Sequence, residues 1–230
     1  MLGIIGAMDE EVAKIKEQME DVQVMEKAGM EFFEGVLSGK KVVVVRSGIG
    51  KVNAALCTQI LVDTYEVDAV INTGIAGSLN ADINIGDIVL STDTVEHDMD
   101  AVAFGYPLGQ IPRMDTFSFE TDSALRALAK RVCEEKLSEI SIFEGRVVSG
   151  DQFVSDKTKK EWLVSNFAGY CTEMEGAAIA HAAYLNRIPC LIVRAISDKA
   201  DDSASVDYPT FEAQAIQNSV KLLLGICEKL

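Results

Sequence analysis

Carboxylates occur at three places where apolar segments give way to polar or glycine-rich ones. Asp9-Glu10-Glu11 follows the apolar N-terminus, Glu173-Met174-Glu175 precedes a run of small residues, and Asp198 follows Arg194 and Ser197. A positioned carboxylate can serve as a general base for water, and a protonated carboxyl group can serve as a general acid. A carboxylate also offers two acceptor oxygens, which match the adjacent hydroxyls of a ribose.

Each of these acids also has a simpler structural explanation. Acids in a first helical turn complement the helix dipole and cap free N–H groups, and for Asp9-Glu10-Glu11 alone this explanation is the commoner one. It applies equally to Glu173 and Glu175, of which we expect only one to face a given site. Asp198 could be a turn residue. Arg194 is harder to assign to packing, because a buried charge is costly unless it is paired or used.

Glycines also gather after apolar runs, where they let the backbone approach a ligand closely. Gly74-Ile75-Ala76-Gly77-Ser78 could be a phosphate cradle or a plain turn after a strand. It matches neither GxGxxG nor the GxxxxGK[ST] pattern, so a dinucleotide site or a P-loop is poorly supported. The cradle and the turn both remain open for this segment.

Short apolar runs alternate with segments of helical period, which predicts an α/β protein. Nearly apolar strands need cover on both faces, so we expect a mixed or mainly parallel sheet in a single domain over residues 1–230. Ligands of such sheets bind where the strands end. The predicted strands are Leu2–Ile5, Lys41–Arg46, Ala69–Thr73, Asp87–Leu90, Gly145–Ser149 and Leu191–Ala195, with a short one at Gly169–Cys171. The predicted helices are Glu10–Met19, Val52–Tyr65, Ser123–Lys136, Asp156–Asn166, Gly176–Asn186 and Thr210–Glu228.

Composition excludes several classes of partner. The 230 residues include 36 acidic and 21 basic side chains, a net charge of −15, which argues against binding nucleic acid or anionic membranes. Five cysteines without a CxxC pair predict buried thiols in a reducing compartment, and two histidines leave little for a metal site. Without an export signal or an apolar run of about 20 residues, we expect a cytoplasmic protein.

Six motifs occur in a fixed order along the chain. They are Gly3-Ile4-Ile5-Gly6-Ala7-Met8-Asp9-Glu10-Glu11, Ser47-Gly48-Ile49-Gly50-Lys51, Asn72-Thr73-Gly74-Ile75-Ala76-Gly77, Val148-Ser149-Gly150-Asp151-Gln152-Phe153, Glu173-Met174-Glu175 and Arg194-Ala195-Ile196-Ser197-Asp198. Together they resemble the bacterial 5′-methylthioadenosine/S-adenosylhomocysteine nucleosidases, within the purine nucleoside phosphorylase superfamily. The resemblance covers essentially the whole chain.

The resemblance implies a three-layer α/β/α fold with a central mixed, twisted sheet, usually in a homodimer. It implies hydrolysis of the N-glycosidic bond of 5′-thioadenosine nucleosides, and of 5′-deoxyadenosine as well, without a metal or an organic cofactor. Asp198 would protonate adenine N7 and Glu11 would activate water. Glu175 would hold the ribose hydroxyls, with Met174 packed against the sugar.

The resemblance places further residues around the same ligand. Phe153 would stack on adenine, the backbone near Val154 would read the base edge, and the Ala76-Gly77 turn would lie close to the nucleoside. Ser197 and Arg194 would support Asp198 and its loop. The remaining expected contacts with substrate are Met8, Ile49 and Glu173, and Phe104 and Pro112 of a neighbouring subunit would line the 5′-thio pocket. Ile75 stands where relatives often carry a small polar residue, so no side-chain hydrogen bond is expected there.

Two other functions remain as alternatives. A nucleoside phosphorylase would need cationic groups and N–H donors for phosphate, and Arg46 is the nearby cation that could supply a charge. The acidic triplet beside it would repel phosphate instead. A non-catalytic nucleoside-binding protein would be marked by the loss of one carboxylate, but both Glu11 and Asp198 are present. His181, Trp162 and the tyrosines show no pattern and are interpreted as structural.

Overall fold

Ten strands and six α-helices make up the structure, a computed structural model that describes residues 1–230. The strands are β1 Leu2–Gly6, β2 Glu20–Lys27, β3 Met30–Leu37, β4 Lys40–Arg46, β5 Ala69–Ser78, β6 Ile88–Glu96, β7 Phe119–Glu120, β8 Ile142–Ser149, β9 Cys171–Glu173 and β10 Cys190–Asp198. The helices are α1 Asp9–Lys16, α2 Lys51–Tyr65, α3 Ser123–Lys136, α4 Lys157–Phe167, α5 Gly176–Asn186 and α6 Ala204–Lys229, with a 3₁₀ turn at Val102–Phe104. Every predicted strand and helix is present, although several boundaries differ.

The sheet is mixed, as predicted. β1 lies between β4 and β5 and is parallel to both, and β5 is parallel to β10. β10 then pairs antiparallel with β6, β6 pairs parallel with β8, and β9 joins β8 back to β5. The five strands β5, β10, β6, β8 and β9 therefore close into a ring at one end of the sheet, whereas β4, β3 and β2 extend it at the other end.

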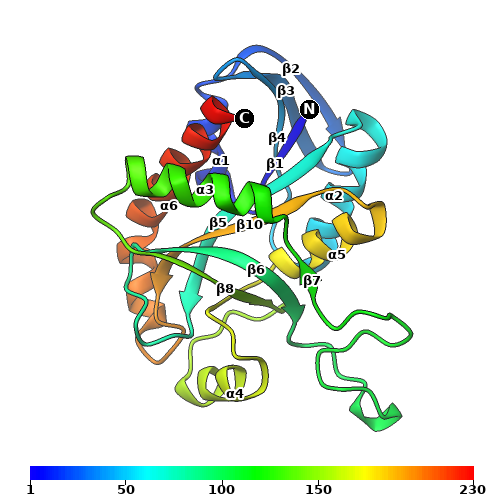
Figure 1. Cartoon of the computed structure of the whole chain (residues 1–230), viewed down its shortest axis with the longest axis vertical. Coiled ribbons are helices and arrows are strands. Elements are labelled where there is room, and N and C mark those ends of the chain that lie inside the picture. The colour runs from blue at the N-terminus through cyan, green and yellow to red at the C-terminus, as the bar shows by residue number, and fades with distance from the viewer.

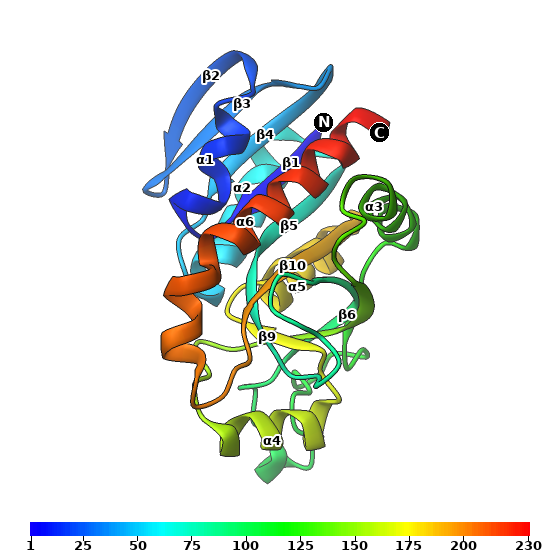
Figure 2. The ribbon, with the colours of Figure 1, turned by 90° about the vertical axis from the view of Figure 1, so that its left-hand side faces the viewer.

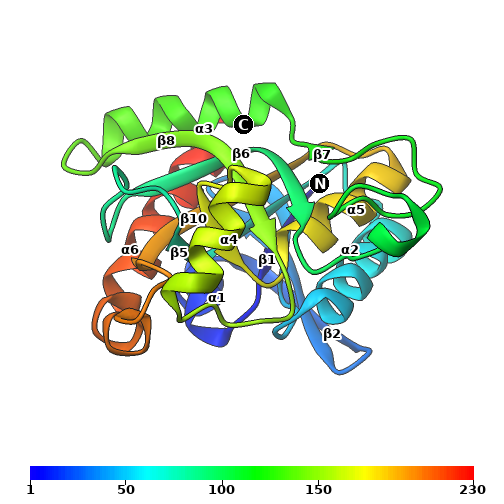
Figure 3. The same cartoon turned by 90° about the horizontal axis from the view of Figure 1, so that it is seen from below.

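Helices cover both faces of the sheet (Figure 1). One core packs α1, α3 and α6 against residues such as Ile4 and Val44, and the other packs α2 and α5 against Ile5 and Val45. Neighbouring strand residues thus enter opposite cores, as the alternation of side chains along a strand requires. Figure 3 shows α4 across the end of the molecule, where it covers a smaller cluster that includes Leu163 and Phe167. The helices on the two faces of the sheet confirm the predicted three-layer α/β/α fold.

The hairpin β2–β3 was not predicted. Every residue of β2 is exposed and half of its side chains are charged, so it lacks the apolar run that marks a buried strand. The hairpin signal was the turn Ala28-Gly29, whose φ angles of 53° and 72° suit the tight turns that favour antiparallel pairing.

Three predicted boundaries were wrong near the strand ends. Gly74–Gly77 is the second half of β5 and not a turn, because its backbone pairs with β10 and β9. The short strand predicted at Gly169–Cys171 lies at Cys171–Glu173. Helix α6 begins at Ala204 and contains Pro209, although the predicted helix began only at Thr210.

All five cysteines are buried and free, on elements distributed across the molecule. Among the helices, none combines the length and the apolar character that crossing a bilayer would require.

Candidate active site

A cavity of about 580 Å³ lies where β1, β4, β5, β8, β9 and β10 end. This is the edge where the glycines, hydroxyls and carboxylates had been expected to gather. The lining includes these predicted residues: Met8, Glu11, Ile49, Ala76, Gly77, Phe153, Val154, Glu173, Met174, Glu175, Ser197 and Asp198.

Glu11 links the end of β1 to β5. One of its oxygens, Oε2, accepts hydrogen bonds from the backbone N–H groups of Ala7 and Met8 at 2.6 and 3.0 Å, and Oε1 accepts one from Ile75 at 3.2 Å. A Cβ on Gly74 would lie 2.7 Å from Oε1, so glycine is needed for this approach. Burial raises the pKa of Glu11, although the charge of Arg194 and the three N–H groups oppose that rise.

The N-terminal capping explanation for Glu11 also holds. Glu11 is the third residue of α1, and its side chain caps the backbone of Met8. The same side chain nevertheless reaches Ile75 in another element and borders the cavity. A cap that only satisfied its own helix would make no contact with β5.

Asp198 lies at the end of β10, where the pairing with β5 shifts register between Ile196 and Asp198. Its Oδ2 accepts a hydrogen bond from the Ser197 hydroxyl at 2.9 Å, and its Oδ1 accepts one from the backbone N–H of Ala200 at 2.8 Å. The residue is only 2% exposed, and burial raises the pKa of its carboxyl group despite these two donors. A raised pKa favours the protonated form that a general acid needs.

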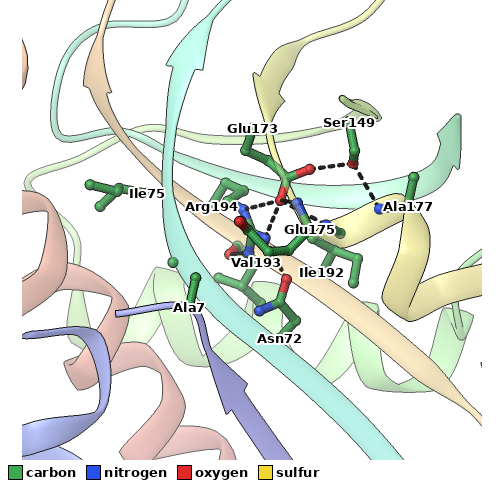
Figure 4. Close-up of polar contacts among 12 residues, drawn as sticks. Ala7, Asn72, Ile75, Ser149, Glu173, Glu175, Ala177, Ile192, Val193 and Arg194 are labelled. Carbon is green, nitrogen blue, oxygen red and sulfur yellow. Dashed lines mark hydrogen bonds and ion pairs between the residues drawn. The ribbon is translucent and has the colours of Figure 1, made fainter. Parts of the chain in front are cut away.

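Glu173 and Glu175 both line the cavity, so the expectation that only one would do so was wrong. The two residues have different partners, as Figure 4 shows for Glu173. Glu173 forms a buried ion pair with Arg194 and accepts hydrogen bonds from the Ser149 hydroxyl and from the N–H of Gly176, the latter at 2.8 Å. Although burial opposes it, the Arg194 charge with these donors lowers the pKa of Glu173.

Glu175 has far fewer partners than Glu173. Its Oε1 accepts a hydrogen bond from the backbone N–H of Gly50 at 2.8 Å. Burial, together with the negative charge of Glu173, raises the pKa of Glu175 well above its ordinary value. Its remaining acceptor capacity is available to a ligand in the cavity.

Arg194 does not have the predicted role. It is 1% exposed and does not line the cavity. Its guanidinium binds Glu173, Asn72 and the carbonyl of Val193, and not Asp198 (Figure 4). The reason is its place within β10, where Glu173 and Asn72 surround it inside the sheet. Ser197 is the residue that contacts Asp198.

An aromatic pair covers another side of the cavity. The rings of Phe153 and Tyr208 meet edge to face with 5.7 Å between centroids. The Tyr208 hydroxyl donates to Glu212 at 2.9 Å and lies 3.4 Å from the sulfur of Met8. Tyr208 comes from the N-terminal turns of α6, which descend in orange beside the strand ends in Figure 2. Tyr208, which was interpreted as structural, therefore lines the cavity.

The sequence and the fold match proteins of known family. The sequence model of the phosphorylase superfamily matches residues 1–228. A Staphylococcus carnosus protein named 5′-methylthioadenosine/S-adenosylhomocysteine nucleosidase is 40% identical over 231 residues, covering 100% of both chains. The chain belongs to this nucleosidase family of the phosphorylase superfamily.

Solved structures of the nucleosidase family agree closely with this one. The Neisseria meningitidis 5′-methylthioadenosine/S-adenosylhomocysteine nucleosidase, in complex with methylthio-immucillin-A, has a TM-score of 0.96 and 37% identity, with 100% of this chain and 99% of that chain covered. A Helicobacter pylori protein named futalosine hydrolase has a TM-score of 0.94 and 39% identity, with 100% and 97% covered.

Within this nucleosidase fold, the cavity has no cationic wall. None of its lining residues is Lys, Arg or His. Arg46, the cation that could have favoured a phosphorylase, lies outside the lining and pairs with Asp9 at 3.1 Å. A phosphate bound in the cavity would therefore face carboxyl groups such as Glu11 and Glu175 without a positive side chain in the lining.

Several lining residues were not predicted: Ala7, Ile75, Gln152, Thr172, Ser205, Tyr208 and Pro209. Most are neighbours of predicted residues, so extending each motif by one position would have found them. Ser205, Tyr208 and Pro209 form a separate group on α6 whose only signal was their position after Asp198. Phe104 and Pro112 are exposed and lie outside the cavity of their own chain.

Proposed function

We propose that this chain hydrolyses the N-glycosidic bond of 5′-methylthioadenosine and S-adenosylhomocysteine, releasing adenine and the 5-thioribose derivative. The observation that carries the proposal is the pair of buried carboxyl groups, Glu11 and Asp198, which border one cavity without a cationic side chain. A hydrolase needs both a base and an acid there, whereas a phosphorylase needs a phosphate site.

Asp198 is the general acid in this proposal. Adenine is a poor leaving group as an anion, so a proton must reach N7 as the C1′–N9 bond breaks and its electrons move into the purine. Delivery of that proton contributes about 10²–10⁴-fold to the rate. The raised pKa of Asp198 supports this role, and the Ser197 hydroxyl and the Ala200 N–H fix the orientation of the carboxyl group.

Glu11 is the general base. A water molecule attacks C1′ of the oxocarbenium-like sugar as Glu11 accepts its proton, which forms the C1′–O bond. Inverting sugar hydrolysis uses a similar pair of carboxyl groups in opposite protonation states. Burial raises the pKa of Glu11, and three N–H donors with the nearby Arg194 charge oppose that rise by stabilising the ionised form that a base needs.

The remaining contacts distribute the nucleoside across the cavity. Glu175 accepts hydrogen bonds from the ribose 2′- and 3′-hydroxyls. Its Oε1 already accepts one from the backbone N–H of Gly50, which leaves acceptor capacity for these hydroxyls. Met174 packs against the sugar. Phe153 stacks on adenine, and the backbone near Val154 contacts the base edge.

The 5′-substituent would extend toward a second copy of the chain. The groove between α2 and α5 is lined by exposed apolar side chains, among them Val52, Leu56 and Leu185. Such a face supports a homodimer, in which Phe104 and Pro112 of the neighbouring subunit would close the 5′-thio pocket. An apolar pocket discriminates by only about 1–3 kcal/mol per methylene, so broad 5′-specificity is expected.

The first experiment incubates the protein with methylthioadenosine, with and without phosphate, and identifies the sugar by mass spectrometry. Methylthioribose formed at equal rates in both reactions is the expected result. A sugar 1-phosphate that appears only with phosphate would make the protein a phosphorylase. Binding without cleavage would make it a nucleoside-binding protein. The 5′-specificity is tested with S-adenosylhomocysteine and 5′-deoxyadenosine. Futalosine is added because one relative is named futalosine hydrolase.

A further inference from the structure

Three charged residues outside the cavity form a closed ring of hydrogen bonds. The backbone N–H of Lys51 donates to Asp151 Oδ1 at 2.8 Å, and the backbone N–H of Asp151 donates to Asp98 Oδ2 at 3.0 Å. The Lys51 ammonium closes the ring by donating to Asp98 Oδ1 at 2.6 Å. Lys51 is the first residue of α2, Asp98 follows β6 and Asp151 follows β8. The ring therefore joins segments that are about 50 and 100 residues apart in the sequence.

Helix polarity alone does not explain the position of Lys51. A cation in the first turn of a helix opposes the helix dipole, which favours anions at that end. The Lys51 ammonium is instead held by two carboxylates, Asp98 and Glu96, the latter at 3.0 Å, and its side chain is only 19% exposed. Gly50, at the N-cap of α2, has no side chain to cap the helix, and Asp151 supplies that acceptor from another loop.

Both loops tied by the ring lead directly into the cavity. Ile49 and Gly50 precede Lys51, and Gly50 donates its N–H to Glu175. Gln152, Phe153 and Val154 follow Asp151 and line the cavity. The two loops touch, since a Cβ on Gly50 would lie 3.1 Å from Asp151 Oδ1.

We propose that Lys51, Asp98 and Asp151 are positioning residues for nucleoside recognition. None of them lines the cavity, so they act through Gly50 on the Glu175 carboxylate and through the loop after Asp151 on Phe153. This inference rests on the ribose and adenine contacts proposed above. The ring of hydrogen bonds fixes the spacing between the Glu175 carboxyl group, which would hold the sugar, and the Phe153 side chain, which would stack on the base.

The test is a set of variants assayed with methylthioadenosine. Lys51→Met is expected to raise KM by about tenfold, with a smaller change in kcat. Tenfold is the effect expected from losing the hydrogen bond that the Lys51 ammonium donates to Asp98. Lys51→Arg keeps the charge and should recover part of the loss. If the ring acts as a unit, the double variant Lys51→Met/Asp98→Asn is no worse than the poorer single variant. Lys130→Met removes a lysine that pairs with Glu144 on the surface and serves as the matched control.

Thermal melts separate positioning from folding, and light scattering separates it from loss of a dimer, because Lys51 also lines the groove between α2 and α5. A rise in KM found only together with a change of oligomeric state would overturn the proposal. A lower Tm with KM within twofold of the parent value, or losses that add in the double variant, would overturn the proposal. Asp98→Asn alone gives the same comparison if Lys51→Met does not fold. Glu175→Gln, assayed in parallel, shows whether a failed test contradicts the proposed ribose contact or only the role of the hydrogen-bond ring. If it too leaves KM unchanged, the ribose contact is wrong, and if it raises KM while Lys51→Met does not, only the ring is wrong.

Discussion

At the scale of single residues, Glu11 and Asp198 are two buried carboxyl groups with different neighbours. Burial raises the pKa of both carboxyl groups. Glu11 accepts three backbone N–H bonds and lies in the field of Arg194, all of which favour the anion. Asp198 has one N–H donor and a hydroxyl, and Asp201 and Asp207 nearby favour its neutral form. The pair is therefore suited to act as base and acid at the same pH.

This difference predicts a bell-shaped dependence of kcat/KM on pH. Activity should fall at low pH as Glu11 gains a proton, beginning above the ordinary glutamate range because its pKa is raised. It should fall at high pH as Asp198 loses its proton.

Asp198→Asn should reduce kcat by about 10²–10⁴-fold, because an amide cannot deliver the N7 proton. Glu11→Gln should reduce kcat strongly and keep nucleoside binding.

The measurements are kcat/KM across pH and nucleoside affinity by calorimetry. A near-normal rate for Asp198→Asn would reject its role as the acid. Loss of binding in Glu11→Gln, together with the loss of rate, would mean that Glu11 holds the ligand more than it activates water.

Arg194→Met tests the buried ion pair. The side chains of Arg194 and Glu173 are 2% and 4% exposed, so removing the guanidinium leaves a carboxylate buried without its partner. We expect a loss of about 3–5 kcal/mol in the free energy of unfolding, measured in urea. The double variant Arg194→Met/Glu173→Gln should recover much of that loss. Equal stability of the single and double variants would show that the pairing contributes little.

The position of a residue in the cavity lining was predictable where a motif carried it to a strand end, as for Glu11, Glu175 and Asp198. The partners of Arg194 were not, because Asn72 lies 122 residues away and meets it only when β5 pairs with β10. Tyr208 was missed for a related reason. Proline usually ends a helical pattern, so Pro209 concealed the helical turn that brings Tyr208 to the cavity.

At the scale of elements, the pairing of β5 with β10 positions Asp198. The register shift brings Asp198 beside Gly77, where an added Cβ would lie 2.7 Å from Asp198 Oδ1 and 2.8 Å from the Ala200 Cβ. The glycine of β5 is therefore required by the close approach of the neighbouring strand, and not by a turn.

Gly77→Ala should displace the Asp198 carboxyl group and reduce kcat by at least about tenfold, since misplaced catalytic groups lose rate steeply. The measurement is kcat together with Tm. Gly39→Ala is the control, because Gly39 has a φ of 79° but nothing within 4 Å of an added Cβ. It should lower Tm without changing kcat, and a Gly77→Ala protein with unchanged kcat would contradict the argument.

At the scale of the whole molecule, some of the most exposed apolar residues lie on α2, on α5 and in the 3₁₀ turn. Val52 and Leu185 on α2 and α5 are 71% and 63% exposed, and Phe104 is 85% exposed. Leu185→Asp should convert a dimer to a monomer in light scattering and raise KM for methylthioadenosine, because Phe104 of the neighbour would be lost. Val24→Asp, on the edge strand β2, is the matched control and should change neither. A wild-type monomer in solution would reject the shared pocket.

The layers and the mixed sheet were predictable because apolar strands need helices on both faces. The closure of β5, β10, β6, β8 and β9 was not, since it depends on antiparallel pairings between distant segments. Those pairings also lengthened β5 and β10 beyond their apolar runs. The pairing itself determines where the strands end, and therefore where Gly77 and Asp198 meet.

The five buried cysteines give the fold a built-in set of probes for local opening. Burial raises the pKa of Cys133 and Cys190 to about 12 and that of Cys227 to about 11, so almost none of these thiols is ionised at neutral pH. The thiolate is the form that attacks an alkylating reagent, so each cysteine must leave the core and ionise before it can react. Mass spectrometry of partly alkylated protein would therefore time the opening of α2, α3, β9, β10 and α6 separately. Ligand that orders the strand ends should slow the alkylation of Cys171, on β9, more than that of Cys133, on α3.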